Sequence, residues 1–323
     1  MHIYRNILSH AASHVMHDKR LWIFGLFAGL LNTGSVIDSL VQLTREAGVL
    51  TSPAVLFVRA VPGLTSFLTY LHTLSLLAIG RAAITGGLVI SIFAVVLLLS
   101  LNGQANLFHY VKERRKRLAF WHPSGATLVR LFVVNLFSRV VLAVMSVLGS
   151  MILTTLGQGD FALRALVTFA VLVVTIPFAL LFGALTIFAM IEIVTKGKVI
   201  VDAYADAWQI IRYHLTAVME VAVLLFLVGL LGTLVLMGAM ILFAIPYFLL
   251  IIASLALKSL VLWSLVLVFG GVVLVSLILL FGALFTSFVY TTWFLTYQKF
   301  SVKTKVVSKI ERILKHVQRL SFN

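Results

Sequence analysis

The chain has 323 residues, of which 62% are hydrophobic and 11% are charged. Soluble domains are roughly half apolar and about a quarter charged, so this composition excludes an ordinary water-soluble fold. The absence of cysteine excludes disulfides, thiolate metal sites and cysteine nucleophiles. We therefore expect an all-α, polytopic integral membrane protein.

Six apolar segments predict membrane-spanning helices, because a span needs about 20 mostly apolar residues. The first, about residues 21–41, is interrupted by polar residues such as Asp38. Its start resembles the apolar region of a signal peptide, but no small-residue cleavage site follows, so we favour a retained helix over a cleaved one. Gly25 and Gly29 would allow it to pack closely. The other spans are expected at about 84–108, 138–157, 165–191, 221–241 and 261–295.

Two further apolar stretches leave the number of membrane-spanning helices open. Residues 64–80 resemble a short span, but a seventh crossing would move the basic residues after position 111 to the outside. We therefore expect 42–83 to be an external segment with one or two helices on the membrane surface. Residues 242–257 follow the fifth span and contain Pro246; we expect an apolar connection at the outer interface or dipping into the bilayer.

Basic clusters predict the orientation, because short loops rich in Lys and Arg stay cytoplasmic. The densest cluster comprises Lys112, Arg114, Arg115, Lys116 and Arg117. Six spans with both termini inside place this cluster, and the others, in the cytoplasm. The net charge of +15 is then explained by the orientation of the chain in a bacterial cytoplasmic (inner) membrane. We therefore do not expect nucleic acid as a partner.

The tail, residues 299–323, is predicted to form a basic amphipathic helix. Its apolar residues recur at steps of three and four. Its cations are expected to contact anionic lipids of the inner leaflet; they include Lys303, Lys305, Lys309, Arg312, Lys315 and Arg319. A protein partner, a homo-oligomer and a merely solvated helix remain alternatives. Trp22, Trp121 and Trp208 are predicted interfacial anchors.

Ionisable residues within spans are candidates for function. Arg139, Glu192 and Glu220 lie near the predicted cytoplasmic boundary of spans three to five, and Asn135 stands one turn before Arg139. We favour a structural ion-pair cluster that joins these helices; a proton- or substrate-handling site and separate interfacial residues are the alternatives. Pro177 is expected to kink the fourth span.

Glycines inside the last two spans predict further close helix contacts. They are Gly229, Gly232, Gly270 and Gly271. No Walker, GxSxG, HExxH or kinase motif occurs in the sequence. We expect no enzymatic activity, no cofactor and no metal.

Three segments carry a resemblance to a known group of proteins. "HDKRLWIFGLFAGLL" (His17–Leu31) resembles a basic helix leading into a Leu-Trp-x-Phe-Gly span. "KGKVIVDAYADAWQIIRYHLTAVMEVAVLLFLV" (Lys196–Val228) resembles an Ala-Trp amphipathic helix before a long span, and "FWHPSGATLVRLFVVNLFSRVV" (Phe120–Val141) looks like a degenerate copy of it. The pattern is similar to largely uncharacterised bacterial six-helix proteins and to the membrane domain attached to some glycerophosphodiester phosphodiesterases. This resemblance implies a six-helix membrane architecture. It assigns no catalytic residue to this chain.

These features together favour a non-enzymatic scaffold or accessory protein in membrane, envelope or lipid homeostasis. The alternative is a small transporter or lipid-handling channel with its pathway near Arg139, Glu192 and Glu220. A polar cavity reaching the middle of the membrane would favour the transporter, and a tightly packed apolar centre would favour the scaffold.

Overall fold

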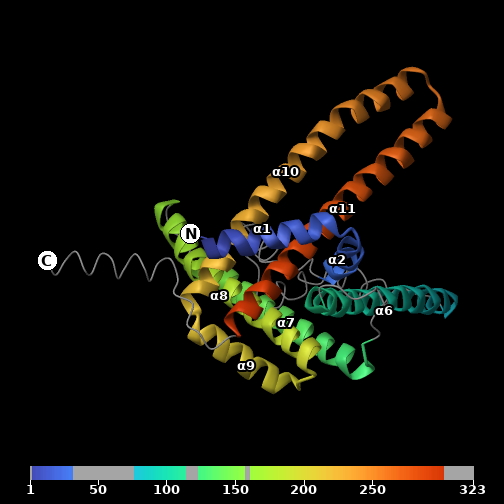
Figure 1. Ribbon diagram of the computed structural model, residues 1–323. Helices are drawn as coiled ribbons and strands as arrows, with labels where there is room; N and C mark the ends of the chain where they lie inside the picture. The colour runs from blue at the N-terminus through green and yellow to red at the C-terminus, as the bar shows by residue number, and fades with distance from the viewer. Residues whose placement is uncertain (1, 32–75, 114–122, 157–160, 302–323) are drawn as a thin grey trace. The chain divides into compact units, whose positions relative to one another are not determined.

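The computed structural model describes residues 2–31, 76–113, 123–156 and 161–301. Within these ranges every regular element is an α-helix (Figure 1). The helices are α1 (His2–His17), α2 (Arg20–Leu31), α6 (Leu76–Glu113), α7 (Gly125–Leu156), α8 (Phe161–Lys196), α9 (Ile200–Tyr213), α10 (Leu215–Ala256) and α11 (Leu260–Phe300). The chain divides into two compact units: residues 1–29, 102–123 and 208–323 form one, and residues 30–101 and 124–207 form the other.

Five of the described helices are long and apolar enough to cross a membrane. Their apolar segments are Ile84–Lys112, Gly125–Leu153, Ala165–Lys196, Leu215–Ala256 and Val261–Phe300. They overlap the five later spans predicted from the sequence, but Gly125–Leu153 begins well before the predicted span 138–157. Of the first predicted span, α2 supplies 12 residues, and residues 32–41 lie outside the described part of the chain, as does most of the predicted external segment 42–83.

Helix α10 differs from the sequence prediction. It continues through Pro246 to Ala256, where we expected a span ending near Ile241 and then a separate connection. A proline removes one backbone hydrogen bond, but an apolar segment without water must keep its remaining bonds within a helix. Helix α8 also contains a proline, Pro177, and is continuous through it; the kink expected there stays a prediction.

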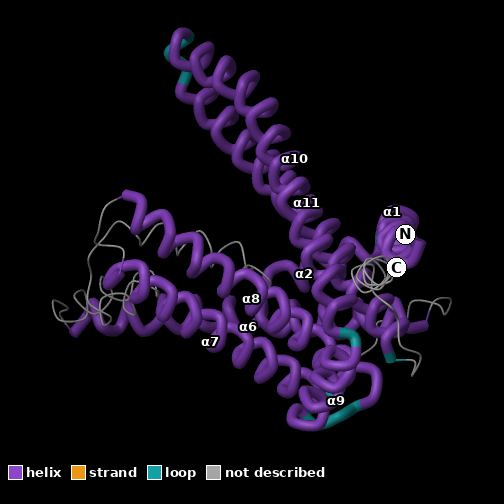
Figure 2. The backbone as a smooth tube through the Cα atoms, turned by 90° about the vertical axis from the view of Figure 1, so that its left-hand side faces the viewer, coloured by secondary structure: helices purple, strands orange, loops and turns teal. Residues whose placement is uncertain are grey.

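In the first unit, α10 and α11 form a long antiparallel hairpin (Figures 1 and 2). The turn between them contains Lys258 with a φ of 48°, a left-handed conformation that residues other than glycine, asparagine and aspartate rarely adopt. Ser259 then caps α11 by accepting a hydrogen bond from the backbone N–H of Leu262 at 3.3 Å. At the other end of the hairpin, the ring of His214 stacks on Phe300 with centroids 4.8 Å apart.

Helix α2 packs against α11 at very short distance. A Cβ at Gly25 would overlap Ser287 Oγ and the Ala283 carbonyl oxygen, and one at Gly29 would lie 3.1 Å from Thr286 Oγ1. Ser287 is fully buried and donates a hydrogen bond of 2.6 Å to the Leu21 carbonyl. The predicted role of the two glycines in close packing is confirmed.

Three of the four glycines predicted to allow close packing in the hairpin lie against an aromatic ring, and the fourth does not. A Cβ at Gly229 would lie 3.1 Å from the ring of Phe285, and one at Gly232 would lie 3.0 Å from Phe281. A Cβ at Gly270 would overlap the ring of Tyr247, whereas one at Gly271 would meet nothing within 4 Å. Close packing is therefore confirmed at the first three positions and wrong at Gly271, which faces away from α10.

In the second unit, α7 and α8 form an antiparallel pair (Figure 2). Thr186 of α8 donates to Ser138 of α7 at 3.3 Å, and the rings of Phe137 and Phe182 lie 6.0 Å apart. Arg130, near the start of α7, reaches the loop that follows α8. These contacts place the start of α7 and the end of α8 at the same end of the pair.

Candidate functional site

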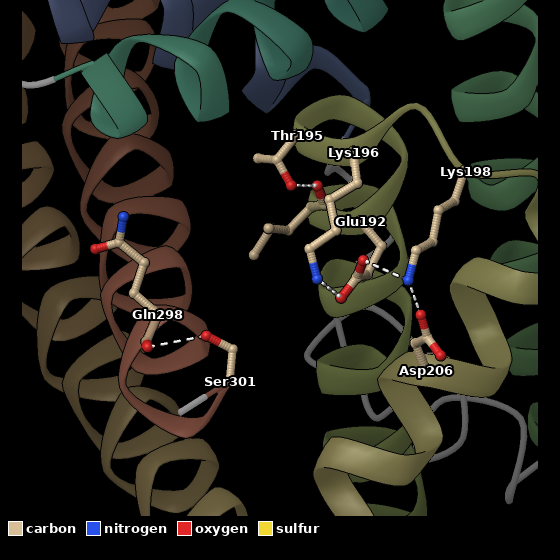
Figure 3. A network of polar contacts seen from close by, with 8 residues as sticks. Glu192, Thr195, Lys196, Lys198, Asp206, Gln298 and Ser301 are labelled. Atoms are coloured by element: carbon tan, nitrogen blue, oxygen red, sulfur yellow. Dashed lines mark hydrogen bonds and ion pairs between the residues drawn. The ribbon is translucent and has the colours of Figure 1, made fainter. Parts of the chain in front are cut away.

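The end of α8 carries a cluster of charged side chains around Glu192 (Figure 3). The Glu192 side chain is 1% exposed. Its Oε1 lies 2.8 Å from Lys196 Nζ, and its Oε2 lies 3.2 Å from Lys198 Nζ. The Lys198 ammonium also pairs with Asp206 of α9. Two cations thus neutralise two carboxylates, one of which is withdrawn from solvent.

The loop that follows α8 makes this convergence possible. Gly197 has a φ of 69°, the left-handed conformation in which glycine commonly terminates a helix. The turn directs Lys198 back toward Glu192. Arg130 Nη1 donates to the Gly197 carbonyl at 2.8 Å and to the Lys198 carbonyl at 3.2 Å, which links the loop to α7. The cluster therefore joins α7, α8 and α9.

Helix α9 is amphipathic in the way expected of an interfacial helix. Ala203, Ala207 and Ile211 are fully buried, whereas Val201 and Trp208 are 75% and 48% exposed. The interfacial position of Trp208 stays a prediction. One face of the helix thus packs on protein and leaves an adjacent apolar strip free.

Tyr204 lies between the two faces of α9. Its ring packs edge-on against Phe137 with centroids 5.8 Å apart. Burial raises the pKa of the Tyr204 phenol above its ordinary value, and the neighbouring Thr186 hydroxyl acts in the opposite direction. The phenol is neutral at physiological pH, and its ring is a packing contact between α9 and α7.

The four predicted cluster residues are distributed over both units. Asn135 donates to the Leu131 carbonyl at 2.8 Å and lies 3.8 Å from Met190 Sδ, so it takes part in the α7–α8 contact. Arg139 is exposed on α7. Glu220 is partly buried on α10, in the first unit. The meeting of Arg139, Glu192 and Glu220 stays a prediction.

Sequence reasoning missed three partners in this cluster, Lys196, Lys198 and Asp206. It treated the two lysines only as topological cations. Glu192 and Lys196 stand four residues apart, the spacing at which opposite charges meet on one helix face, so this pair could have been found. The contacts of Lys198 depend on the turn at Gly197, which the spacing alone does not reveal.

A second polar group lies in the first unit, where α1 and α2 meet the end of α6. Asp18 accepts a hydrogen bond from the Tyr110 hydroxyl, beside a cavity of about 60 Å³ that His14, Leu21 and Val111 also line. Trp22, a predicted anchor, donates to the Val15 carbonyl at 2.7 Å. The cavity has room for water and not for an organic substrate.

Several predicted residues lie outside the described part of the chain. They are Trp121, Arg114, Arg115, Lys116, Arg117, Lys303, Lys305, Lys309, Arg312, Lys315 and Arg319. Lys112 closes the described part of that basic cluster and is exposed. Among the described residues, no three His, Cys, Asp or Glu side chains group in a way that could hold a metal ion.

Five apolar helices of spanning length and an amphipathic helix fixed by buried charge define a multi-pass α-helical membrane protein. The chain matches no family model, no curated protein and no solved structure. The resemblance to the membrane domain of glycerophosphodiester phosphodiesterases stays a prediction.

Proposed function

We propose that this chain is a non-enzymatic scaffold or accessory protein of the bacterial cytoplasmic membrane, acting in envelope or lipid homeostasis. In this proposal it crosses the membrane six times and keeps both termini in the cytoplasm. The observation that carries the scaffold role is the free surface of the outer part of the α10–α11 hairpin, which we call the distal hairpin (residues 230–280).

The distal hairpin has almost no buried side chains. Among its described residues, Ser254, Val266 and Gly270 are the buried ones. Leu242 and Val261 are 76% and 72% exposed. Because α10 and α11 contact each other here without filling a core, the distal hairpin offers two apolar helix faces to the bilayer and to other transmembrane helices.

The length of the distal hairpin suits a membrane. At about 1.5 Å per residue, the 27 residues from Leu230 to Ala256 extend about 40 Å. A bilayer with its headgroups is about 40–45 Å thick. Gly238 also has open space where a Cβ would lie, and such a glycine permits close approach of a helix from another protein.

Buried hydroxyl groups support the alternative, a small transporter or lipid-handling channel. Thr286, Thr291 and Thr296 of α11 are almost fully buried, and Gln104 of α6 donates to the Tyr290 hydroxyl at 3.2 Å. The Thr296 hydroxyl, however, donates to the Thr292 carbonyl one turn earlier at 2.8 Å, an ordinary contact within a helix. We therefore place the scaffold first.

Photo-crosslinking in cells tests the scaffold role. A photoreactive phenylalanine analogue at Leu242 should give a discrete protein adduct, because this side chain lies on the free face of α10. The matched control is the same analogue at Ile84 of α6, which is apolar and 73% exposed but lies outside the distal hairpin. Lipid adducts alone at both positions, together with uptake of a solute by reconstituted vesicles, would contradict the scaffold and favour the transporter.

A further inference from the structure

The distal hairpin contains an apolar groove between its two helices. Its volume is about 300 Å³, and it is lined by Tyr247 and Leu250 of α10 and by Leu265, Val266 and Phe269 of α11. No polar side chain other than the Tyr247 phenol belongs to this lining. The chemistry of such a wall matches a hydrocarbon chain.

The groove exists because the helices touch unevenly. Gly270 lets the ring of Tyr247 lie directly against the backbone of α11, and Phe243 stacks on Tyr247 with centroids 5.7 Å apart. Nearer the turn, Leu250 is 50% exposed and Leu265 is 62% exposed. A tight contact at Gly270 is thus followed by a wider gap on the side of the turn.

The turn itself supplies a single positive charge. Lys258 is the only charged residue between Val221 and Tyr297, and it is exposed. It stands directly before the N-terminus of α11, where the helix dipole adds positive partial charge. Trp263, one turn further along α11, is a residue type enriched at the headgroup level of membranes.

The spacing between charge and groove fits one lipid molecule. At about 1.5 Å per residue, Leu250 and Tyr247 lie about 12 Å and 16 Å along α10 from Lys258. Leu265 and Phe269 lie at similar depths along α11. A phospholipid with its phosphate at Lys258 would therefore carry an acyl chain past each of these side chains.

We propose that Lys258 and the groove form a binding site for an anionic glycerophospholipid. The phosphate group pairs with the Lys258 ammonium, and one acyl chain lies between Leu250 and Leu265 with its end toward Tyr247 and Phe269. The proposed site uses none of the basic residues of the tail or of the cluster at 112–117. It goes beyond the scaffold role and does not depend on a protein partner.

Quenching of Trp263 fluorescence tests the site. The protein is reconstituted into vesicles of equal phosphatidylglycerol and phosphatidylcholine, with bromine on the acyl chains of one lipid or the other. The signal of Trp263 is obtained by subtracting the Trp263→Phe variant. We expect brominated phosphatidylglycerol to occupy the site about fivefold more than brominated phosphatidylcholine, the ratio that one cation near an anionic headgroup contributes.

Two pairs of variants test the contributions of the Lys258 charge and of the groove separately. Lys258→Gln should remove the preference for phosphatidylglycerol, and Lys258→Arg should keep it. Leu250→Phe, which fills the groove, should reduce quenching by both lipids, whereas Leu249→Phe on the neighbouring exposed position should not. Equal quenching by the two lipids in the unsubstituted protein, or a preference that survives Lys258→Gln, would overturn the proposal. All variants are compared at equal elution volume in size-exclusion chromatography, so that a misfolded sample is recognised.

Discussion

Gly25→Leu is expected to prevent accumulation of folded protein. The new Cβ would overlap both a side chain and the backbone of α11, at Ser287 Oγ and the Ala283 carbonyl. A backbone atom cannot rotate away, so α2 would have to move outward and break the hydrogen bond from Ser287 to Leu21. Overpacking of this kind costs up to about 3 kcal/mol and occasionally more, to which the lost buried bond adds about 1 kcal/mol.

The measurement is the monodisperse yield after detergent extraction, followed by the thermal unfolding midpoint of any folded fraction. Gly271→Leu is the matched control, because a Cβ at Gly271 meets nothing within 4 Å. It should express and unfold like the unsubstituted protein. If Gly25→Leu and Gly271→Leu give the same yield and midpoint, α2 does not pack on α11 as described.

Glu192→Lys is expected to destabilise the end of α8 by about 3 kcal/mol or more. The substitution places a third ammonium beside Lys196 and Lys198 at a side chain that is 1% exposed. Removing one partner of a buried ion pair costs about 3–5 kcal/mol, but the two lysine side chains are 48% and 30% exposed, so solvent screens part of the repulsion. The expected loss of stability is therefore at the lower end of this range.

The rate of trypsin cleavage in the loop after α8 measures this local loss of stability in the purified protein. In Glu192→Lys, cleavage after residues 196 and 198 should accelerate by more than tenfold, because the loop loses its contact with the buried carboxylate. Asp202→Lys makes the same change of charge at an exposed acid of α9 and should leave the cleavage rate within about twofold. Equal acceleration in both variants would show that net charge, and not the buried carboxylate, controls the loop.

The sequence was sufficient for the class of protein and for the close contact of α2 with α11. A hydrocarbon environment imposes a minimum length on each apolar helix, so the five helices long enough to cross a membrane could be located from their apolar runs alone. Gly25 and Gly29 were identifiable because small residues in an apolar helix have few purposes other than close packing.

Other features depend on contacts between distant residues, and the sequence could not supply them. The pairing of α10 with α11, in which Gly270 accommodates the ring of Tyr247, is a contact of this kind. The ion pair of Lys198 depends on the left-handed turn at Gly197. Gly271 has the same neighbourhood in the sequence as Gly270, and only the rotation of α11 shows that it faces away from α10.

The most direct test of the account is the accessibility of single cysteines in intact cells. The chain contains no cysteine, so Lys258→Cys and Arg115→Cys each introduce one reactive thiol. With a membrane-impermeant maleimide, Lys258→Cys should react in intact cells, and Arg115→Cys should react only after the membrane is permeabilised. Labelling of Arg115→Cys in intact cells, or protection of Lys258→Cys there, would contradict the proposed crossing of the membrane by α6, α10 and α11.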